Sequence, residues 1–464
     1  MAESLISVGL DIGTTTTQLI VSKLFIENTA SAFSIPEMKI ANREILYKSA
    51  IHFTPLATDG LMDGDKIRHI VEAEYDHAGI SRKEVNTGAL IITGESSRKE
   101  NAKIVAASLS EIAGDFVVAT AGPHLESTLA AKGSGAEEYS AQVGKTVLHI
   151  DIGGGTSNLA LIRNGTIVST GCMNIGGRLL KLDENGRIYY RSPILSHYDH
   201  LQIGTQATSS MLQDLCHTMV HALEMACGLR ESTPLLNQFW TAEAGNPWLP
   251  PNDVAIISFS GGVAHCIENE ITPLTFGDIG PVLGQCIRNS LLCQSKYRIA
   301  NESIRATVIG AGSYATQLSG STVFSQNIQF PLKNLPVATQ IEALSQLDQP
   351  GILYIPPQEN KSYAAIIDLA KKLIHNWPFQ AIYIATQSDM AKALGHALAL
   401  RTSPLRRILC IDRVQLSEDS YLDVGNPIGS TFPIIIKTLI WQTESTHHPI
   451  VNGGSHEAKN NLIG

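Results

Sequence analysis

The sequence lacks the features that would tie it to nucleic acid, to secretion or to a membrane. Its formal net charge is -9, and no run of basic residues supplies a field that attracts a phosphate backbone. The N-terminus has no basic segment ahead of an apolar one, so we expect no signal peptide. The most apolar stretch near the C-terminus, 432–441, is too short to span a bilayer and contains Lys437. We therefore expect a cytoplasmic protein that binds neither nucleic acid nor membrane.

Cysteine is present without any spacing that would make it structural. The seven cysteines are scattered, include no C-x-x-C pair and are odd in number. This pattern favours reduced thiols over a disulfide framework. With 464 residues, of which 44% are hydrophobic, the chain is long enough for two or three domains that each have an apolar core.

What the sequence does contain is one pattern written twice. Residues 8–21 read VGLDIGTTTTQLIV, and residues 148–161 read LHIDIGGGTSNLAL. Each copy predicts an apolar strand, a tight Gly/Thr turn led by an aspartate, and a second apolar strand. A β-hairpin without a ligand would explain one copy as well as a binding site does. Two copies that match at Asp11 and Asp151 favour two halves that close on one nucleotide.

The residue types in both turns suit a phosphate chain that carries a divalent cation. Asp11 and Asp151 offer carboxylates to a Mg²⁺ that keeps most of its waters. Glycine removes the Cβ that would block a phosphate, and threonine adds a hydroxyl donor. The predicted phosphate contacts are Gly13, Thr14, Thr15, Thr16, Gly153, Gly154, Gly155 and Thr156.

Two further glycine-containing segments follow the second hairpin. In FSGGVAH (259–265) an apolar strand is predicted to run into a turn, where Gly261 and Gly262 would let the backbone lie against the sugar and α-phosphate of a nucleotide. The segment 306–320, ATVIGAGSYATQLSG, is predicted to be another strand, glycine turn and helix.

The order of these motifs carries a resemblance. Two Asp-Ile-Gly hairpins, a strand–Pro–helix unit at Pro123, NIGG at 174–177 and then Ser-Gly-Gly resemble the superfamily of actin, sugar kinases and heat-shock-chaperone ATPases. The likeness covers residues 4 to about 320. It implies an α/β actin-like ATPase fold with two lobes around a nucleotide cleft, and a site for ATP and Mg²⁺.

The pattern of strands and helices changes after about residue 330. We predict a small appended α/β unit with strands at 352–357, 381–387 and 407–412 and helices at 361–377 and 388–401. The predicted segments of the chain are a first lobe at 1–138, a second lobe at 139–330, the appended unit at 331–441 and a disordered tail at 442–464.

The sequence departs from the chaperone pattern at one position of the site. In chaperones of this superfamily a glutamate precedes the proline of the linking segment and helps to position the attacking water. Here Gly122 precedes Pro123, and the nearest acidic residues are Glu126 and Glu95. A solvated helix residue is the favoured interpretation of Glu126, and the alternative is a catalytic carboxylate that acts beside Asp11 and Asp151.

Over essentially its full length the chain resembles the family of ethanolamine ammonia-lyase reactivating factors of ethanolamine-utilising bacteria. The resemblance implies an ATPase that releases damaged cobalamin from the inactivated lyase and so admits intact adenosylcobalamin. No Asp-x-His-x-x-Gly stretch occurs, so the partner enzyme is expected to carry the cobalamin. The resemblance leaves open whether the protein forms a homo-oligomer and whether it associates with a bacterial microcompartment.

Two other functions share the same hairpins. A small-molecule kinase of this superfamily would transfer phosphate to a hydroxyl and would need a carboxylate base that faces an acceptor pocket. An actin-like filament protein would assemble in the presence of ATP. The sequence places no acceptor base, so we rank the reactivating factor ahead of both.

Overall fold

A computed structural model describes most of the chain. The described residues are 3–13, 16–28, 38–57, 61–81, 84–93, 101, 105, 109, 117–120, 123–241, 248–294, 296–301, 303–314, 316–320, 322–357, 362–416, 420–427, 429 and 431–437. Thr14, Thr15, Glu95, Gly122 and the predicted tail lie outside these residues. Within the described ranges, no helix combines the length and the apolar character that crossing a bilayer would take.

The first lobe is built on one mixed sheet. Three antiparallel strands lead to two parallel strands, in the order β3-β2-β1-β5-β6, and a short β4 pairs with the start of β2. Helix α1 (Gly64–Ala78) begins where Asp63 caps the backbone N–H of Lys66 and ends at the left-handed Gly79. The strands are β1 (Glu3–Ile12), β2 (Thr16–Asn28), β3 (Met38–Lys48), β4 (His52–Phe53), β5 (Thr87–Ile92) and β6 (Val117–Thr120).

The second lobe repeats this sheet. Its order, read in the same direction as that of the first lobe, is β9-β8-β7-β12-β13. When the strands on this path are counted along the chain, both sheets therefore have the order third, second, first, fourth, fifth. The first three are again antiparallel and the last two again parallel to the first. The strands are β7 (Val147–Ile152), β8 (Ser157–Arg163), β9 (Thr166–Met173), β12 (Ile256–Ser260) and β13 (Tyr297–Ile299). This duplication confirms the two-lobed, actin-like α/β fold.

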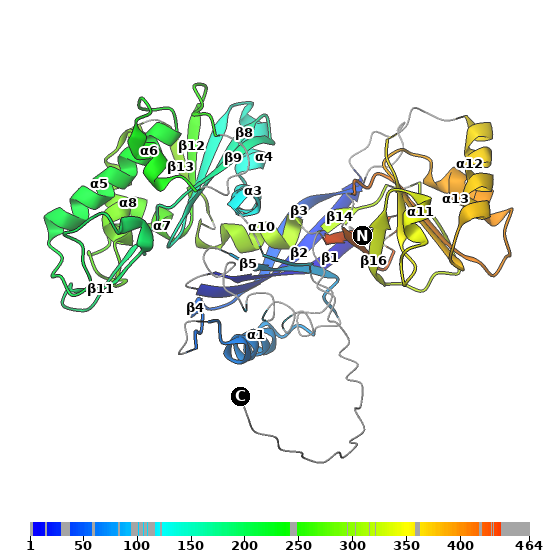
Figure 1. Cartoon of the computed structure of the whole chain (residues 1–464), viewed down its shortest axis with the longest axis horizontal. Helices are drawn as coiled ribbons and strands as arrows, with labels where there is room; N and C mark the ends of the chain where they lie inside the picture. The colour runs from blue at the N-terminus through cyan, green and yellow to red at the C-terminus, as the bar shows by residue number, and fades with distance from the viewer. Residues whose placement is uncertain are drawn as a thin grey trace, which may run out of the picture.

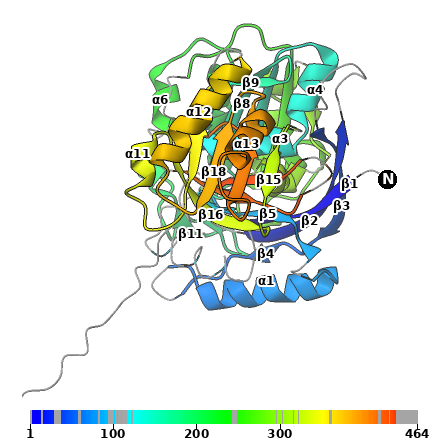
Figure 2. The ribbon, with the colours of Figure 1, turned by 90° about the vertical axis from the view of Figure 1, so that its right-hand side faces the viewer.

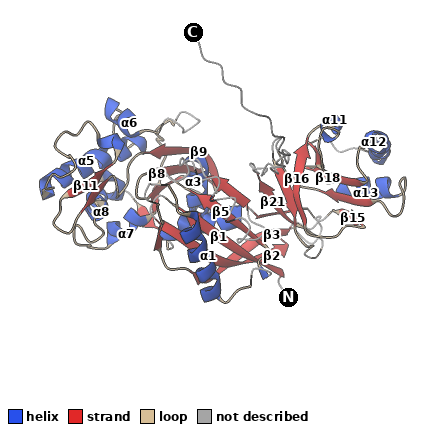
Figure 3. Ribbon diagram, turned by 60° about the horizontal axis from the view of Figure 1, so that its bottom comes forward, coloured by secondary structure: helices blue, strands red, loops and turns tan. Residues whose placement is uncertain are grey.

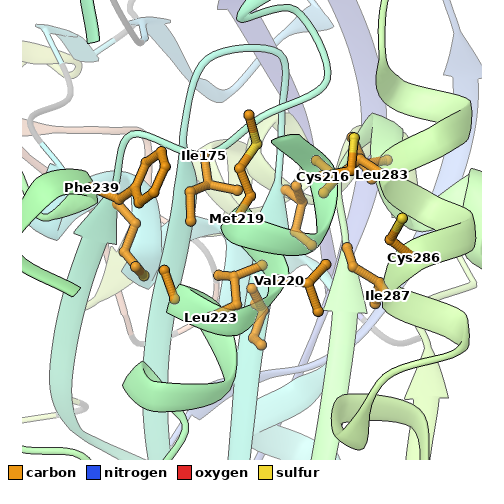
Figure 4. Close-up of a cluster of buried hydrophobic side chains, with 14 of the residues drawn as sticks. Ile175, Cys216, Met219, Val220, Leu223, Phe239, Leu283, Cys286 and Ile287 are labelled. Atoms are coloured by element: carbon orange, nitrogen blue, oxygen red, sulfur yellow. The ribbon is translucent and has the colours of Figure 1, made fainter. Parts of the chain in front are cut away.

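The largest apolar core lies in the second lobe (Figure 4). Helix α5 (Ser209–Ala226) places Cys216, Met219, Val220 and Leu223 on one face, and α8 (Gly280–Arg288) packs against it. The smaller elements of this lobe are β10 (Leu180–Leu182), β11 (Ile188–Arg191), α4 (Ala136–Val143), α6 (Pro234–Phe239), α7 (Gly262–Glu268) and α9 (Leu291–Gln294).

Two helices cross between the lobes. Helix α3 (Pro123–Gly133) packs on β7, β8 and β9 of the second lobe, whereas α10 (Ala306–Tyr314) packs on β1, β2 and β5 of the first (Figure 1). Their backbones touch, because an ideal Cβ on Gly310 would lie 1.9 Å from the Leu129 carbonyl oxygen and one on Gly133 would lie 1.7 Å from the Ala306 oxygen. The strand predicted at the start of 306–320 and the helix predicted at its end are therefore both wrong: α10 comes first, where Gly310 permits a close helix crossing, and a strand, β14 (Thr316–Leu318), follows.

The appended unit is joined to the first lobe through an eight-stranded sheet of order β14-β21-β20-β16-β17-β18-β19-β15. Its centre is parallel, and α12 and α13 lie side by side on it (Figure 2). The elements are β14 (Thr316–Leu318), β15 (Phe324–Gln326), β16 (Leu332–Ala338), α11 (Ile341–Leu344), β17 (Ile352–Ile355), α12 (Tyr363–Asn376), β18 (Ala381–Thr386), α13 (Ala391–Ala399), β19 (Arg407–Ile411), β20 (Tyr421–Val424) and β21 (Pro433–Lys437).

The first lobe lies between the second lobe and the appended unit (Figures 1 and 3). Strand β21 contacts β6, and Ile435 shares an apolar cluster with Ala89, Leu129 and Ala311. The limits predicted for the segments remain predictions. Strand pairing places β14 and β15 in the eight-stranded sheet of the appended unit, although both precede residue 331.

The crossing of α3 and α10 gives a stability prediction. Gly310→Ala should destabilise the protein by about 3 kcal/mol, the upper part of the range for overpacking, because the added Cβ meets backbone that cannot move aside. Gly64→Ala is the matched control, since its Cβ would lie 3.3 Å from a valine methyl, Cγ2 of Val105. Urea denaturation of both variants checks this, and equal stability of the two would contradict the crossing.

Candidate nucleotide-binding site

A cavity of about 590 Å³ lies between the two lobes and is lined by both hairpins. Its volume is within the usual range for small-molecule sites. All the predicted site residues that the structure describes line it: Asp11, Gly13, Thr16, Glu126, Asp151, Gly153, Gly154, Gly155, Thr156, Gly261 and Gly262. The residues that sequence reasoning chose from distant segments thus meet at one place.

The two hairpin turns have the same geometry. In the first, the Gly13 N–H donates to the Thr16 carbonyl oxygen at 2.9 Å, and in the second the Gly153 N–H donates to that of Thr156 at 2.9 Å. A Cβ on Gly155, which lines the cavity, would meet no atom within 4 Å and would project into open space. The turn therefore leaves room for a group to approach its backbone.

Each aspartate accepts a hydrogen bond from a hydroxyl on the neighbouring parallel strand. Thr93, directly after β5, donates to Asp11 Oδ1 at 2.9 Å. Ser260, the last residue of β12, donates to Asp151 Oδ1. The two lobes therefore hold their carboxylates in the same way.

Burial raises the pKa values of both carboxyl groups. The pKa of Asp11 rises to about 7, mainly by burial, with the Thr93 hydrogen bond opposing and the charge of Asp151 adding to the rise. The pKa of Asp151 rises to about 6 by burial, against hydrogen bonds from Ser260 and Thr307. Two like charges in one partly dry cavity favour a bound cation.

A pair of amide side chains also lines the cavity. Gln18 lies opposite Asp11 in the strand register, and Asn158 lies opposite Asp151. Gln18 Oε1 and Asn158 Oδ1 are both buried without a hydrogen-bond partner in the protein. Carboxylate and amide oxygens are ligands that suit Mg²⁺. Within the described ranges no three His, Cys, Asp or Glu side chains are placed to hold a metal.

Glu126 is part of this cavity. It lies in the first turn of α3, is 5% exposed and accepts a hydrogen bond from Asn158 Nδ2 at 3.1 Å. Its burial excludes the solvated helix position that the sequence favoured. Through Asn158 it lies next to the strand position of Asp151, where a carboxylate can orient a water.

Glycines outside the hairpins hold the second turn in place. The N–H groups of Gly177 and Arg178 donate to the carbonyl oxygens of Gly153 and Gly154 at 3.0 and 2.6 Å. Gly261 has φ +89°, and a Cβ there would lie 2.3 Å from the Ile152 oxygen, so only glycine fits between β12 and the hairpin. A Cβ on the next residue, Gly262, would enter open space at the cavity wall.

Sequence reasoning missed the amides and the hydroxyls of the site. The repeat itself holds a signal for Gln18 and Asn158, which are both carboxamides at matching positions. Thr93 directly follows β5 and Ser260 ends β12, but no local pattern marks a hydroxyl at either place as functional.

The family model described as "Ethanolamine utilisation protein EutA" matches residues 3–350 and 339–442. The chain belongs to the EutA family. An EutA family relative from Escherichia coli K12, named ethanolamine ammonia-lyase reactivase EutA, is 37% identical over 463 residues, which cover 94% of this chain and 98% of the relative. The protein of the same name from Salmonella typhimurium is 36% identical, with the same shares covered.

Solved structures resemble this EutA family chain more distantly. A Ppx/GppA phosphatase from Aquifex aeolicus is 11% identical with a TM-score of 0.40, covering 66% of this chain and 99% of that one. The ethanolamine utilization protein EutJ from Carboxydothermus hydrogenoformans is 16% identical with a TM-score of 0.33, covering 67% and 89%.

The raised pKa of Asp11 gives a pH-dependent stability prediction. Its pKa is about 7 in the folded protein and near 3.8 when exposed, so the carboxyl group supports the fold below pH 4 and this support is lost as the pH rises through 7. Without nucleotide or cation, Asp11→Asn should therefore raise the melting temperature by a few degrees at pH 8 and leave it unchanged at pH 4.

The exposed Asp214→Asn serves as the control and should show no such difference between the two pH values. Mg²⁺ with a nucleotide should reverse the order at pH 8, because only the unaltered protein gains from binding. Equal melting temperatures of Asp11→Asn and the unaltered protein at pH 8 would contradict a charged, buried pair.

Proposed function

We propose that this chain is an ATP-dependent reactivating factor for ethanolamine ammonia-lyase. The observation that supports it best is the cavity in which two equivalent hairpins, one from each lobe, meet with Asp11 and Asp151. Family membership supports the choice of partner, because both curated relatives are named reactivases of that enzyme.

In this proposal each group of site residues has its own role. Asp11 and Asp151 would hold hydrated Mg²⁺, which supplies charge neutralisation for the phosphates of ATP. The glycines of both turns, together with Gly261 and Gly262, would admit the phosphates and the nucleoside. Glu126, fixed by Asn158, would orient the water that attacks the terminal phosphate.

The two crossing helices would turn nucleotide state into movement. A phosphate chain that is gripped from both lobes favours one angle between them, and loss of the terminal phosphate releases that preference. Helices α3 and α10, which touch at Gly133 and Gly310, are the place about which the lobes would turn. Such a movement could loosen the lyase, release damaged cobalamin and admit adenosylcobalamin.

The proposal predicts that one variant will lose ATP hydrolysis and keep ATP binding. Glu126→Gln should lower the rate of ATP hydrolysis by about 100-fold, a typical loss for a general base, while the affinity for ATP changes little. Glu342→Gln, on the exposed surface of α11, is the matched control. Phosphate release and ATP titration measure the two effects. A normal hydrolysis rate in Glu126→Gln would remove Glu126 from the mechanism.

The partner is tested by recovery of enzyme activity. Inactivated ethanolamine ammonia-lyase, incubated with this protein, ATP, Mg²⁺ and adenosylcobalamin, should regain deaminase activity, and Asp151→Asn should not support the recovery. ATP hydrolysis without recovery would refute the reactivating function. Transfer of labelled phosphate to a small molecule would then indicate a kinase, and ATP-dependent sedimentation would indicate a filament.

A further inference from the structure

A buried chain of polar side chains runs through the second lobe and ends at Asp151. His149 lies two residues before Asp151 on β7, and Ser258 and Ser260 lie opposite these two residues on β12. Alternate residues of adjoining strands face the same side of a sheet, so all four point towards the layer of α3. His149, Ser258 and Ser260 are 0% exposed.

Apolar side chains pack around the middle of this chain on the sheet. Ala131, Val147, Ala160 and Ile256 form a buried cluster on the same part of the sheet. A neutral imidazole in such a place costs stability unless both of its ring nitrogens are satisfied. A chain of four polar residues here therefore indicates a role beyond packing.

The protons in the chain have one consistent arrangement. Ser260 donates its hydroxyl proton to Asp151 Oδ1, so its oxygen is left to accept from His149 Nε2 at 2.9 Å. His149 Nδ1 then accepts from the Ser258 hydroxyl at 3.2 Å. Ser134, at 3.5 Å from Nδ1, already donates to the Ala131 oxygen at 3.0 Å. The hydrogen bonds thus run in one direction, from Ser258 to His149 to Ser260 to Asp151.

The first lobe has no imidazole at the position that would match His149. The position that matches His149 in the repeat is Gly9, where a Cβ would lie 2.3 Å from the Val308 carbonyl oxygen of α10. The crossing helix therefore fills the space that the imidazole occupies in the second lobe. Asp11 is held by Thr93, whereas Asp151 is held by a hydroxyl that is itself fixed by a buried ring.

We propose that His149 is a positioning residue, which acts through Ser260 to fix the Asp151 carboxylate for cation binding. This rests on the proposed function, because it concerns the same carboxylate. The ring donates to Ser260 and so commits the serine proton to Oδ1 of Asp151. Residues that orient a metal-binding group in this way typically contribute 10- to 100-fold to metal affinity.

The test measures the binding of Mn²⁺ in the presence of ADP, followed by the electron paramagnetic resonance signal of free Mn²⁺. His149→Leu should weaken the binding by about 10- to 100-fold. His149→Gln, whose amide N–H can replace the Nε2–H donor, should retain most of the affinity. Ser140→Ala removes a buried hydroxyl that donates to the Lys145 oxygen elsewhere in this lobe, and it should leave the affinity unchanged.

A double-mutant cycle separates positioning from packing. If His149 acts through Ser260, His149→Leu in a Ser260→Ala background should cause no further loss of Mn²⁺ affinity. Losses that add, or unchanged affinity in His149→Leu, would overturn the inference. Absence of Mn²⁺–ADP binding by the unaltered protein would instead refute the proposed function.

Nuclear magnetic resonance of the unaltered protein with ¹⁵N-labelled histidine tests the same chain without a change in the core. One buried ring should carry its proton on Nε2, and its signal should shift when Mg²⁺ and ADP are added. Ser260→Ala should abolish that shift. A proton on Nδ1, or a signal that does not respond to Mg²⁺ and ADP, would overturn the inference even if His149→Leu does not fold.

Discussion

The constraint on which the site depends is the placement of two carboxylates from different lobes in one cavity. Asp11 and Asp151 each stand at the end of an apolar strand, and burial raises the pKa of both. Water cannot fully solvate them, so hydroxyls hold them, and in the proposed function a cation would relieve their repulsion. The hairpin, the neighbouring parallel strand and the unpartnered amide oxygens all serve this placement.

The duplicated sheet explains why the same arrangement of aspartate, amide and hydroxyl occurs in both lobes. In each lobe the first strand carries the aspartate, the second carries an amide opposite it, and the fourth ends near a hydroxyl that donates to it. The strand order puts the first strand between the second and the fourth, so both partners are adjacent to the aspartate. Each lobe contributes one carboxylate of the pair, and the two line one cavity where the lobes face each other.

The sequence was sufficient to predict those hairpins, helices and strands that neighbouring residues determine. The Asp-Ile-Gly repeat predicted both hairpins, Pro123 and Gly133 marked the bounds of α3, and the apolar runs at 352–357, 381–387 and 407–412 predicted the parallel strands of the appended unit. It failed where the cause is distant in the chain. Thr93 and Ser260 lie 82 and 109 residues from the aspartates that they hold, and no periodicity reports that distance.

Helix α10 shows the same limit for secondary structure. Its sequence, ATVIGAGSY, has two glycines and β-branched residues, which disfavour a helix, and a strand was predicted for its start. The helix forms because Gly310 lets it lie directly on α3, and because Val308 covers Gly9 on the first sheet. Tertiary contact thus outweighs local propensity at the place where the lobes join.

The repulsion between the two aspartates also bears on how the lobes move. Without a cation, bringing the lobes closer raises the free energy of two partly desolvated charges, so the pair resists closure. In the proposed function, a cation and phosphates between them would be attracted by both charges and would favour closure. The effect of the two carboxylates on the interlobe angle would then change sign with what occupies the cavity. If Ser260 and His149 fix Asp151 within its own lobe as we propose, a change in that balance would move the lobes as rigid bodies and would not be absorbed by a turning side chain.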